Sequence, residues 1–369
     1  MGRPRRQLRA SSCFSAASPP PSGRRGAPLG APPAPAPLVI SVLLPYRDAA
    51  GTLEQAAASV LADMDDRDEL VLVDDGSRDD GPARAGALAA GDARVVSLSS
   101  GGVGIAGALT AGLAACRGAW IARMDADDLS LGGRLAAERA LLEAEPSLGA
   151  VATRVEVFGE SVGDGIRRYV AWQNGLVSAA DHARSIFVES PVCHPSTMIR
   201  RAALDAVGGF REGEFAEDYD LWLRLVDAGW GIAKVPEVLF RWRIHDRNTT
   251  WNDPRLSFDA LRRLRARHLA RRIDRPFGVW GAGAAGRRLA RELEANGAKA
   301  SFFIDIDPLK VGRTRRGAPV LDVDAGLARA RADAALVVVA VAVFGARDLV
   351  RGQLAGRGFV EGRDFVCAA

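Results

Sequence analysis

Near-continuous apolar runs that alternate with helical patterns are the feature that most constrains the fold of this chain. Three such runs lie at residues 38–44, 69–73 and 119–124, and stretches long enough for helices separate them. Strands that are apolar on both faces and separated by helices are typical of a parallel sheet with helices packed on both sides. The sequence therefore predicts an α/β fold with a mostly parallel central sheet.

Acidic residues follow each of these runs. Asp48 lies shortly after the first run, Asp74 and Asp75 come directly after the second, and Asp125 and Asp127 come directly after the third. In a parallel sheet the carboxyl ends of the strands share one edge, and ligands bind beyond that edge. We therefore expect these acids to lie near one another at a binding site.

The turn at residues 125–128 gives the strongest chemical signal. It places three carboxylates within four residues, directly after an apolar run. Carboxylates this close repel one another, and burying them is costly unless a cation compensates. Oxygen ligands suit Mg²⁺ or Mn²⁺, which can in turn hold a diphosphate. The alternative is a solvated turn in which Asp128 caps the next helix, but the second acidic pair, Asp74-Asp75, favours a functional site.

Five short motifs occur in an order that resembles a known family. They are Ser41-Val-Leu-Leu-Pro-Tyr46, Val73-Asp-Asp-Gly-Ser77, Asp125-Ala-Asp-Asp128, His194-Pro-Ser196 and Glu217-Asp218. With this order and spacing, the stretch from Leu38 to Trp251 looks like a family 2 inverting glycosyltransferase of GT-A fold. The resemblance implies a nucleotide-diphospho-sugar donor (uridine-linked by preference), a divalent metal (Mn²⁺ or Mg²⁺) and an acceptor hydroxyl, which a lipid-linked glycan could carry.

The same resemblance assigns roles to single residues. It implies that the first strand ends hold the nucleotide, that Asp127 is the direct metal ligand, and that Asp218 is the general base that deprotonates the acceptor. The implied positions are Pro45, Tyr46, Asp48, Asp74, Asp75 and Asp125 for the donor nucleotide; Asp127, Asp125 and His245 for the metal; and His194, Glu217 and Trp222 for the acceptor side.

Three of these residues also have an ordinary structural explanation. A tyrosine after a buried strand, such as Tyr46, is just as often packed in the core. An acid at a helix N-terminus, such as Asp218, often serves only the helix dipole. A lone histidine in apolar surroundings, such as His194, is more often a hydrogen-bonded structural residue.

Two features argue against a processive, membrane-embedded synthase. No Gln-x-x-Arg-Trp pattern follows Glu217-Asp218, and the longest uncharged apolar run, residues 334–346, is too short to cross a bilayer. We therefore expect a soluble, cytoplasmic protein that transfers a single sugar.

The six arginines of residues 1–37 account for the net charge of +4, since 43 basic and 45 acidic residues remain elsewhere. The composition thus gives no support for a nucleic-acid partner.

The chain divides into four predicted parts. Residues 1–37 hold nine of the nineteen prolines and are predicted to be disordered. The GT-A domain spans 38–252, a basic amphipathic linker helix spans 253–275, and a small α/β domain spans 276–369. The linker would dock on either domain, or would rest on an anionic membrane surface near a lipid-linked acceptor. Its apolar face consists of Leu256, Phe258, Leu261, Leu264, His268 and Leu269.

The last part has the order strand, glycine-rich turn, helix, strand and acid. Gly281, Gly283 and Gly286 form a Gly-x-Gly-x-x-Gly turn, and Asp305 ends the second strand. This is the order of a dinucleotide-binding fingerprint, in which the terminal acid holds a ribose hydroxyl. The part resembles the small Rossmann-like modules attached to nucleotide-sugar-modifying enzymes, and a dinucleotide is one ligand that it could bind. A purely structural module is the alternative.

Three classes of function fit parts of this pattern. The first is a glycosyltransferase of cell-surface glycan biosynthesis. The second is a non-catalytic nucleotide-binding regulatory or scaffold protein that acts through the C-terminal part. The third is an NAD-dependent sugar oxidoreductase, for which the sequence offers no catalytic residues. The acids at positions 75, 127 and 218 favour the transferase over an inert scaffold.

Overall fold

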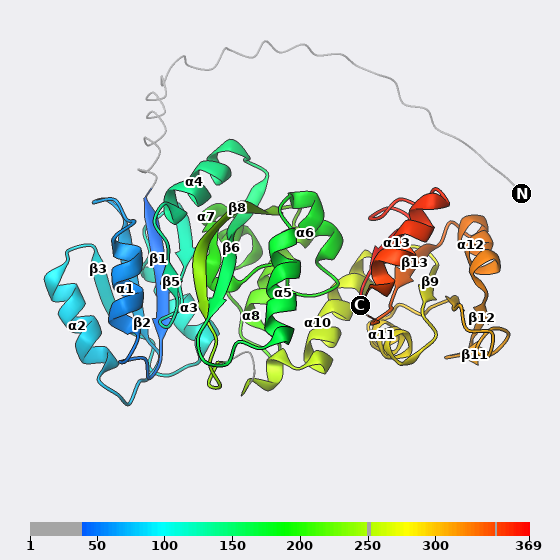
Figure 1. Cartoon of the computed structure of the whole chain (residues 1–369), viewed down its shortest axis with the longest axis horizontal. Helices are drawn as coiled ribbons and strands as arrows, with labels where there is room; N and C mark the ends of the chain where they lie inside the picture. Colours follow the sequence, from blue (N-terminus) through cyan, green and yellow to red (C-terminus); the bar gives the residue numbers. More distant parts are fainter. Residues whose placement is uncertain (1–38, 249–251, 344) are drawn as a thin grey trace, which may run out of the picture. The chain divides into compact units, whose positions relative to one another are not determined.

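A computed structural model describes residues 39–248, 252–343 and 345–369 of the chain. The segment 1–37, for which the sequence predicts disorder, lies outside the described residues. The described residues form two sheets, each with helices packed on it (Figure 1).

The first sheet is mixed and has the strand order β3-β2-β1-β4-β7-β6-β8-β5. Strands β3, β2, β1 and β4 pair in parallel, as the apolar runs predict. Strand β7 is antiparallel to both β4 and β6, and β5 is antiparallel to β8, so the sheet is only partly parallel. The predicted α/β class is confirmed. The strands are β1 (Ile40–Tyr46), β2 (Glu69–Asp74), β3 (Val95–Ser99), β4 (Trp120–Arg123), β5 (Leu129–Ser130), β6 (Leu148–Phe158), β7 (Thr197–Arg200) and β8 (Gly231–Arg243).

Helices cover both faces of this sheet, because alternate residues of each strand point to opposite sides. On β1, Leu43 joins the core that includes α3, whereas Val42 and Leu44 join the core that includes α1 and α4. This explains why β1 is buried at every position. The helices are α1 (Leu53–Leu61), α2 (Gly81–Gly91), α3 (Ile105–Ala115), α4 (Arg134–Ala144), α5 (Asp164–Gly175), α6 (Ala179–Ser185), α7 (Arg201–Val207) and α8 (Glu217–Asp227), with a short 3-10 turn at His194–Ser196.

The second sheet has the order β11-β12-β10-β9-β13-β14. Strand β9 lies at its centre, with β10 on one side and β13 on the other, and only the small β11 is antiparallel to its neighbour. The elements are β9 (Phe277–Trp280), α11 (Ala284–Ala295), β10 (Phe302–Ile304), β11 (Thr314–Arg315), β12 (Ala318–Leu321), α12 (Val323–Ala332), β13 (Leu336–Val339), α13 (Ala346–Gly356) and β14 (Phe365–Cys367).

Helix α10 (Phe258–Arg272) lies between the two sheets in the chain and packs on α8 and α11. The hydroxyl of Ser257 caps its N-terminus by accepting from the backbone N–H of Ala260. Leu264 and Leu269 are buried, which is the arrangement expected of a docked linker helix. Phe258, which the sequence pattern placed on the same apolar face, is instead 83% exposed because it lies at the first turn, beyond the packed part of the helix.

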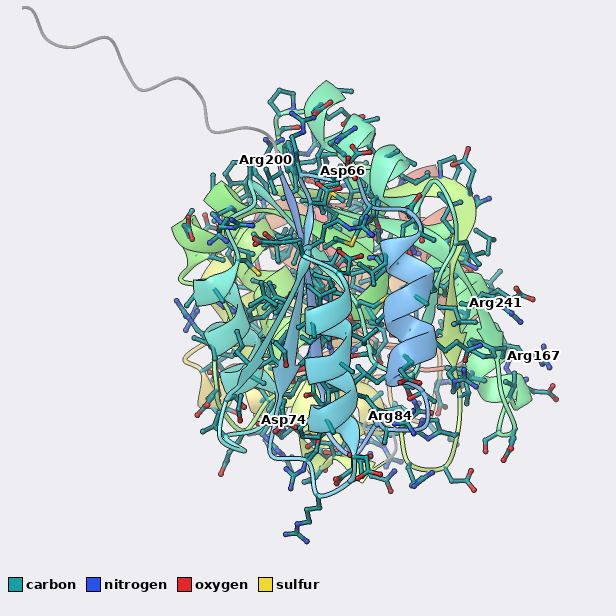
Figure 2. The ribbon with its side chains drawn as sticks, turned by 90° about the vertical axis from the view of Figure 1, so that its left-hand side faces the viewer. Asp66, Asp74, Arg84, Arg167, Arg200 and Arg241 are labelled. Atoms are coloured by element: carbon teal, nitrogen blue, oxygen red, sulfur yellow. The ribbon has the colours of Figure 1, made fainter. Side chains whose placement is uncertain are left out.

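The fold brings the carboxyl ends of β1, β2 and β4 to one edge of the first sheet. Figure 2 shows Asp74, the last residue of β2, at the lower end of the strands, while Asp66 and Arg200 lie at the upper end. The acidic turn after β4 therefore lies at the edge where the sequence predicts a site.

Candidate functional site

Three carboxylates stand together directly after β4. Asp125, Asp127 and Asp128 each offer an oxygen, and these oxygens lie within 4.8 Å of one another. Asp125 and Asp127 are partly exposed, whereas Asp128 is buried. The turn therefore has two acids that face a ligand space and one that lies beneath them.

Each of the three acids has one oxygen held by a donor of the protein. Nη2 of Arg123 lies 2.6 Å from Oδ1 of Asp125. Nε2 of His245 lies 2.9 Å from Oδ2 of Asp127, and the backbone N–H of Arg243 donates to Oδ1 of Asp128 at 2.7 Å. The second oxygen of each acid is left free of these bonds.

The three carboxylates make a set that suits a divalent cation. Oδ2 of Asp128 is buried without a hydrogen-bond partner among the described residues, which is costly for a lone carboxylate oxygen. Burial and the nearby charge of Asp125 raise the pKa of Asp127, and burial with the charge of Asp127 raises the pKa of Asp128 well above its usual range. Hard oxygen ligands with uncompensated charge match Mg²⁺ or Mn²⁺. The residues therefore fit a metal.

Asp128 does not cap the next helix, which the sequence left open as an alternative. Helix α4 begins at Arg134, and its N-cap position is Gly133. Asp128 instead accepts the backbone N–H of Arg243 from the end of β8, so its side chain joins two strand ends.

The tautomer of His245 follows from its two contacts. Its Nδ1 accepts the backbone N–H of Arg247 at 3.1 Å, so the neutral ring carries its proton on Nε2. The Nε2–H then donates to Asp127. In this arrangement His245 orients Asp127 through a hydrogen bond, and direct coordination of a metal by Nε2 would require the bond to Arg247 to break.

Arg123 is a site residue that the sequence argument missed. It is the last residue of β4, its side chain is 4% exposed, and it forms an ion pair with Asp125. A signal was present, because an arginine inside an otherwise apolar run, two positions before an acidic turn, is unusual for a buried strand.

Glu217 and Asp218 begin helix α8, as the motif predicts. Burial and the neighbouring charge of Glu217 raise the pKa of Asp218 to about 7, although Arg123 and the backbone N–H of Tyr219 act in the opposite direction. The charge of Asp125 also raises the pKa of Glu217. These influences show that the start of α8 lies close to the acidic turn. A carboxylate with a pKa near 7 suits general-base chemistry.

The predicted donor-side residues hold two loops together. Oδ1 of Asp75 accepts from Oγ of Ser100 at 2.8 Å and from the backbone N–H of Gly104 at 3.0 Å. Asp74 accepts the backbone N–H of Ser77 at 3.0 Å. A Cβ on Gly76 would lie 3.0 Å from Cα of Gly102, so the two loops meet at a position where a side chain would clash.

The first strand end is shaped by its backbone. Asp48 has a positive φ of 51°, and its Oδ1 accepts the backbone N–H of Arg78 at 2.7 Å. Pro45 and Tyr46 are buried in β1, and Tyr46 is 4% exposed within a core cluster. Burial and the charge of Asp74 raise the pKa of Tyr46 to about 12. This burial fits the packing explanation for Tyr46.

His194 and Trp222, which the sequence predicts on the acceptor side, pack against each other. Their ring centroids are 5.6 Å apart with an interplanar angle of 85°, and Phe210 lies 5.8 Å from the His194 ring. Trp222 is 0% exposed, so it presents no ring face to a sugar. Burial lowers the pKa of His194 well below its usual range, so the ring is neutral. Both residues thus form the packed layer beneath the start of α8.

The predicted nucleotide-binding residues of the C-terminal part belong to the second sheet. Gly281 has a φ of +116°, and a Cβ on Gly286 would lie 1.8 Å from the carbonyl oxygen of Gly281, whereas a Cβ on Gly283 would meet nothing. Asp305 accepts the backbone N–H of Ala282 at 2.8 Å, and Nζ of Lys310 lies 3.3 Å from it. Asp305 is 7% exposed and closes the glycine turn, so its carboxylate is already in use within the protein.

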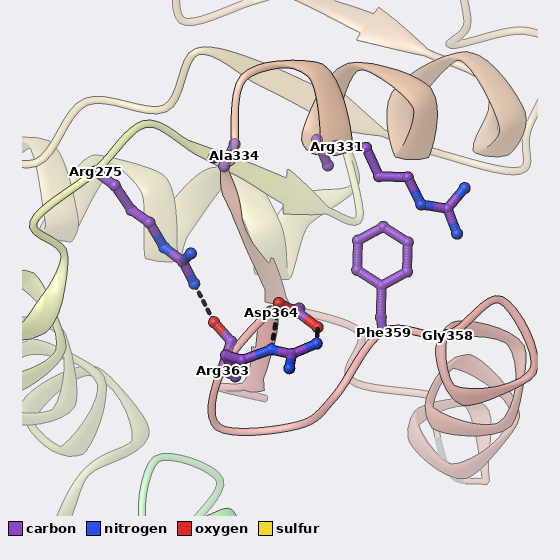
Figure 3. Close-up of a pocket in the computed structure, with 9 residues that line it drawn as sticks. Arg275, Arg331, Ala334, Gly358, Phe359, Arg363 and Asp364 are labelled. Carbon is purple, nitrogen blue, oxygen red and sulfur yellow. Dashed lines mark hydrogen bonds and ion pairs between the residues drawn. The ribbon is translucent and has the colours of Figure 1, made fainter.

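A cavity of about 290 Å³ lies elsewhere in the C-terminal part (Figure 3). Arg275 donates to the carbonyl oxygen of Arg363, and Arg331 donates to that of Arg357, just beyond α13. Cationic side chains are favoured at helix C-termini, where carbonyl groups lack partners. The contact of Arg331 is therefore explained by the end of α13, and the cavity is not part of the acidic site.

The first sheet matches the fold of GT-A glycosyltransferases. The solved structure of S. aureus TarS 1–349 in complex with UDP-GlcNAc aligns with a TM-score of 0.50 over 69% of this chain and 71% of that chain, at 18% identity. This likeness shows the fold. Among the described residues, no helix combines the length and apolar character that a membrane span requires.

Residues 41–208 match the sequence model of Glycosyl transferase family 2. The amylovoran biosynthesis glycosyltransferase AmsE of Erwinia amylovora is 28% identical over 193 residues, which are 52% of this chain and 70% of that relative. The putative glycosyltransferase EpsE of Bacillus subtilis is 29% identical over 209 residues, which are 55% of this chain and 72% of that relative. These similarities favour a glycosyltransferase over a non-catalytic scaffold. Asp218 and His245 follow the segment that the family model covers.

Proposed function

We propose that the protein is a metal-dependent, inverting glycosyltransferase that moves one sugar from a uridine-diphospho-sugar to an acceptor hydroxyl. The domain that would do this spans residues 38–252. The single observation that carries the proposal is the acidic turn after β4. There three carboxylates offer oxygens within 4.8 Å, and one buried oxygen has no hydrogen-bond partner in the described part of the chain.

The metal would be Mn²⁺ or Mg²⁺, held by Asp125, Asp127 and Asp128. A bound divalent metal supplies positive charge to stabilise the departing nucleoside diphosphate. His245 would orient Asp127 through its hydrogen bond, and Arg123 would orient Asp125 through its ion pair, rather than contact the metal.

The donor nucleotide would lie at the neighbouring strand ends. Asp75 would accept a base N–H through Oδ2, because its Oδ1 already accepts from Ser100 and Gly104. Asp48 and Asp74 would shape the loop around the ribose, since both hold backbone N–H groups of residues 77–78. Pro45 and Tyr46 would contribute through the backbone at the end of β1.

Asp218 would act as the general base of a single displacement. Its carboxylate would take the proton of the acceptor hydroxyl while that oxygen forms a bond to the anomeric carbon. The bond between the anomeric carbon and the diphosphate oxygen would break at the same time, which inverts the configuration. The pKa of about 7 leaves Asp218 ionised in a large fraction of molecules at neutral pH.

The acceptor would be a growing cell-surface glycan, and a lipid-linked glycan is the form we propose. The similarity to a relative named for amylovoran biosynthesis supports a role in glycan assembly. The exposed arginines of α10, such as Arg263, Arg267 and Arg271, would meet an anionic membrane surface near such an acceptor. We propose no dinucleotide for residues 276–369, because Asp305 is already bonded within the glycine turn.

Release of nucleoside diphosphate from a panel of nucleotide sugars tests the proposal. The unmodified chain should release it from one donor with Mn²⁺ or Mg²⁺ and not with EDTA. Asp127→Asn should lose metal-dependent nucleotide binding, and Asp218→Asn should bind donor but turn over slowly. Asp66→Asn, at the opposite end of the first sheet (Figure 2), is the matched control and should behave as the unmodified chain. Absence of both release and metal-dependent nucleoside diphosphate binding would contradict the proposal.

A further inference from the structure

We propose that Arg123 is a positioning residue that fixes which oxygen of Asp125 faces the metal and the donor. The inference rests on the proposed function, because it concerns the same acidic turn. It concerns an arginine that touches no substrate itself and would act through the carboxylate of Asp125.

Arg123 is the last residue of β4, an inner strand of the first sheet. Strand β4 lies between β1 and β7, and Arg123 pairs with Leu43 of β1. The carbonyl oxygen of Arg123 accepts from Nη2 of Arg134 at 2.7 Å, and Arg134 is itself fully buried in an ion pair with Glu138. A side chain that leaves such a strand has little freedom, so its far end can orient a neighbour accurately.

The guanidinium forms an ion pair with Asp125 and a hydrogen bond to the preceding residue, Met124. Nη2 lies 2.6 Å from Oδ1 of Asp125, and Nη1 donates to the carbonyl oxygen of Met124. The side chain of Arg123 is 4% exposed and that of Asp125 is 34% exposed. Oδ1 of Asp125 is therefore tied to the buried side, and Oδ2 is the oxygen left to face a ligand.

The positive charge of Arg123 also acts on the other acids of the site. Burial raises the pKa of Asp128, Glu217 and Asp218, and the charge of Arg123 opposes this rise in all three. A guanidinium stays protonated at all working pH values, so this compensation is permanent. A counter-charge alone could be supplied by lysine, whereas an ion pair to Asp125 made at the same time as a hydrogen bond to Met124 uses two nitrogens of the planar fork of arginine.

These two roles predict opposite effects on metal affinity. If Arg123 were only a positive charge beside the site, its removal would strengthen binding of a cation. If it orients Asp125, both Arg123→Gln and Arg123→Lys should weaken binding, because loss of an outer partner of a metal ligand typically costs about 10- to 100-fold in affinity.

The test is the affinity of the full chain for Mn²⁺ alone, followed by the EPR signal of free Mn²⁺. We expect a loss of about tenfold or more for Arg123→Gln and for Arg123→Lys. In the Asp125→Asn background the same arginine changes should have little further effect, because the oriented carboxylate is gone. Arg84→Gln, which removes an exposed ion pair with Glu54, is the matched control.

The outcomes separate this inference from the proposed function. Equal or tighter Mn²⁺ binding by both arginine variants would overturn the positioning role while leaving the metal site intact. An equal loss in the presence and absence of Asp125 would also overturn it, since Arg123 would then act on the fold as a whole. If the unmodified chain binds no Mn²⁺, the metal dependence itself fails, and the role of Arg123 fails with it. Should Arg123→Gln not fold, Arg123→Lys and the double variants carry the test.

Discussion

Nδ1 of His268 lies 2.5 Å from Oδ2 of Asp227, which ties helix α10 to helix α8. Nε2 of the same ring lies 3.7 Å from Oδ1 of Asp220, so one histidine stands between two acids of α8. Arg224 pairs with Asp220, and Arg272 pairs with Asp227. Because α8 carries Glu217 and Asp218 at its first turn, this network links the docked helix to the element that holds the proposed base.

This network predicts a stability that depends on pH. Burial lowers the pKa of His268, but the bonds to Asp220 and Asp227 outweigh it, and the net effect is a raised pKa. Because the pKa of His268 is higher in the folded state, protonation of His268 stabilises the fold. This stabilisation is complete at pH values below the unfolded-state pKa of about 6.5, and it is lost as the pH rises through the folded-state pKa. His268→Gln should therefore lower the free energy of unfolding by about 2 kcal/mol at about pH 6, and by less at about pH 9.

Denaturant unfolding at the two pH values checks this prediction. Arg263→Gln, on an exposed position of the same helix, serves as the control and should change little at either pH. A difference between His268→Gln and the unmodified chain that stays constant or grows with pH would contradict the assigned charge of His268.

The first turn of α8 predicts the pH dependence of turnover. Since Asp218 acts as a base only when ionised, kcat should rise with pH through about 7. Asp218→Asn should lower kcat by about 10²- to 10⁴-fold and remove this rise. Glu217→Gln removes the like charge that raises the pKa of Asp218, so the rise should shift to lower pH. If Glu217→Gln left the pH profile of kcat unchanged, the rise in kcat would come from the titration of a group other than Asp218.

The contact between His245 and Asp127 predicts a graded series of variants. If His245 orients Asp127 through Nε2–H, then His245→Gln keeps a donor and should lose only a few-fold in Mn²⁺ affinity. His245→Ala removes the donor and should lose about 10- to 100-fold. Equal losses in the two variants would favour direct coordination by the ring instead, because glutamine cannot replace an imidazole ligand.

Much of the site follows from the sequence because it lies at strand ends. The apolar runs before Asp74 and Asp125 predict buried parallel strands, and parallel strands bring their carboxyl ends to one edge. The positions of β7 and β8 in the sheet could not be predicted in this way. Strand β7 pairs antiparallel with β4, and β8 pairs with β6, so both pairings depend on contacts between residues far apart in the chain. The bond from Arg243 to Asp128 is one such contact, and it spans 115 positions.

The C-terminal fingerprint shows a different limit of sequence reasoning. Gly281 and Gly286 are needed where the sequence indicates, because a side chain on Gly286 would collide with the backbone of Gly281. The motif does not reveal whether the carboxylate of Asp305 is free to bind a ribose hydroxyl. Asp305 accepts the backbone N–H of Ala282 and lies beside Lys310, and only the side-chain contacts show this.

The burial of Trp222 predicts that it acts on stability and not on the acceptor. Its side chain is 0% exposed, and its indole N–H has no partner among the described residues. Trp222→Phe leaves a cavity next to His194 and should lower the free energy of unfolding by about 1 to 2 kcal/mol. The KM for the acceptor should stay unchanged, because no face of the ring reaches a sugar. Trp242→Phe, on a half-buried position of β8, is the matched control. A rise in acceptor KM with unchanged stability would instead make Trp222 part of the acceptor site, and it would mean that the layer around His194 opens when the acceptor binds.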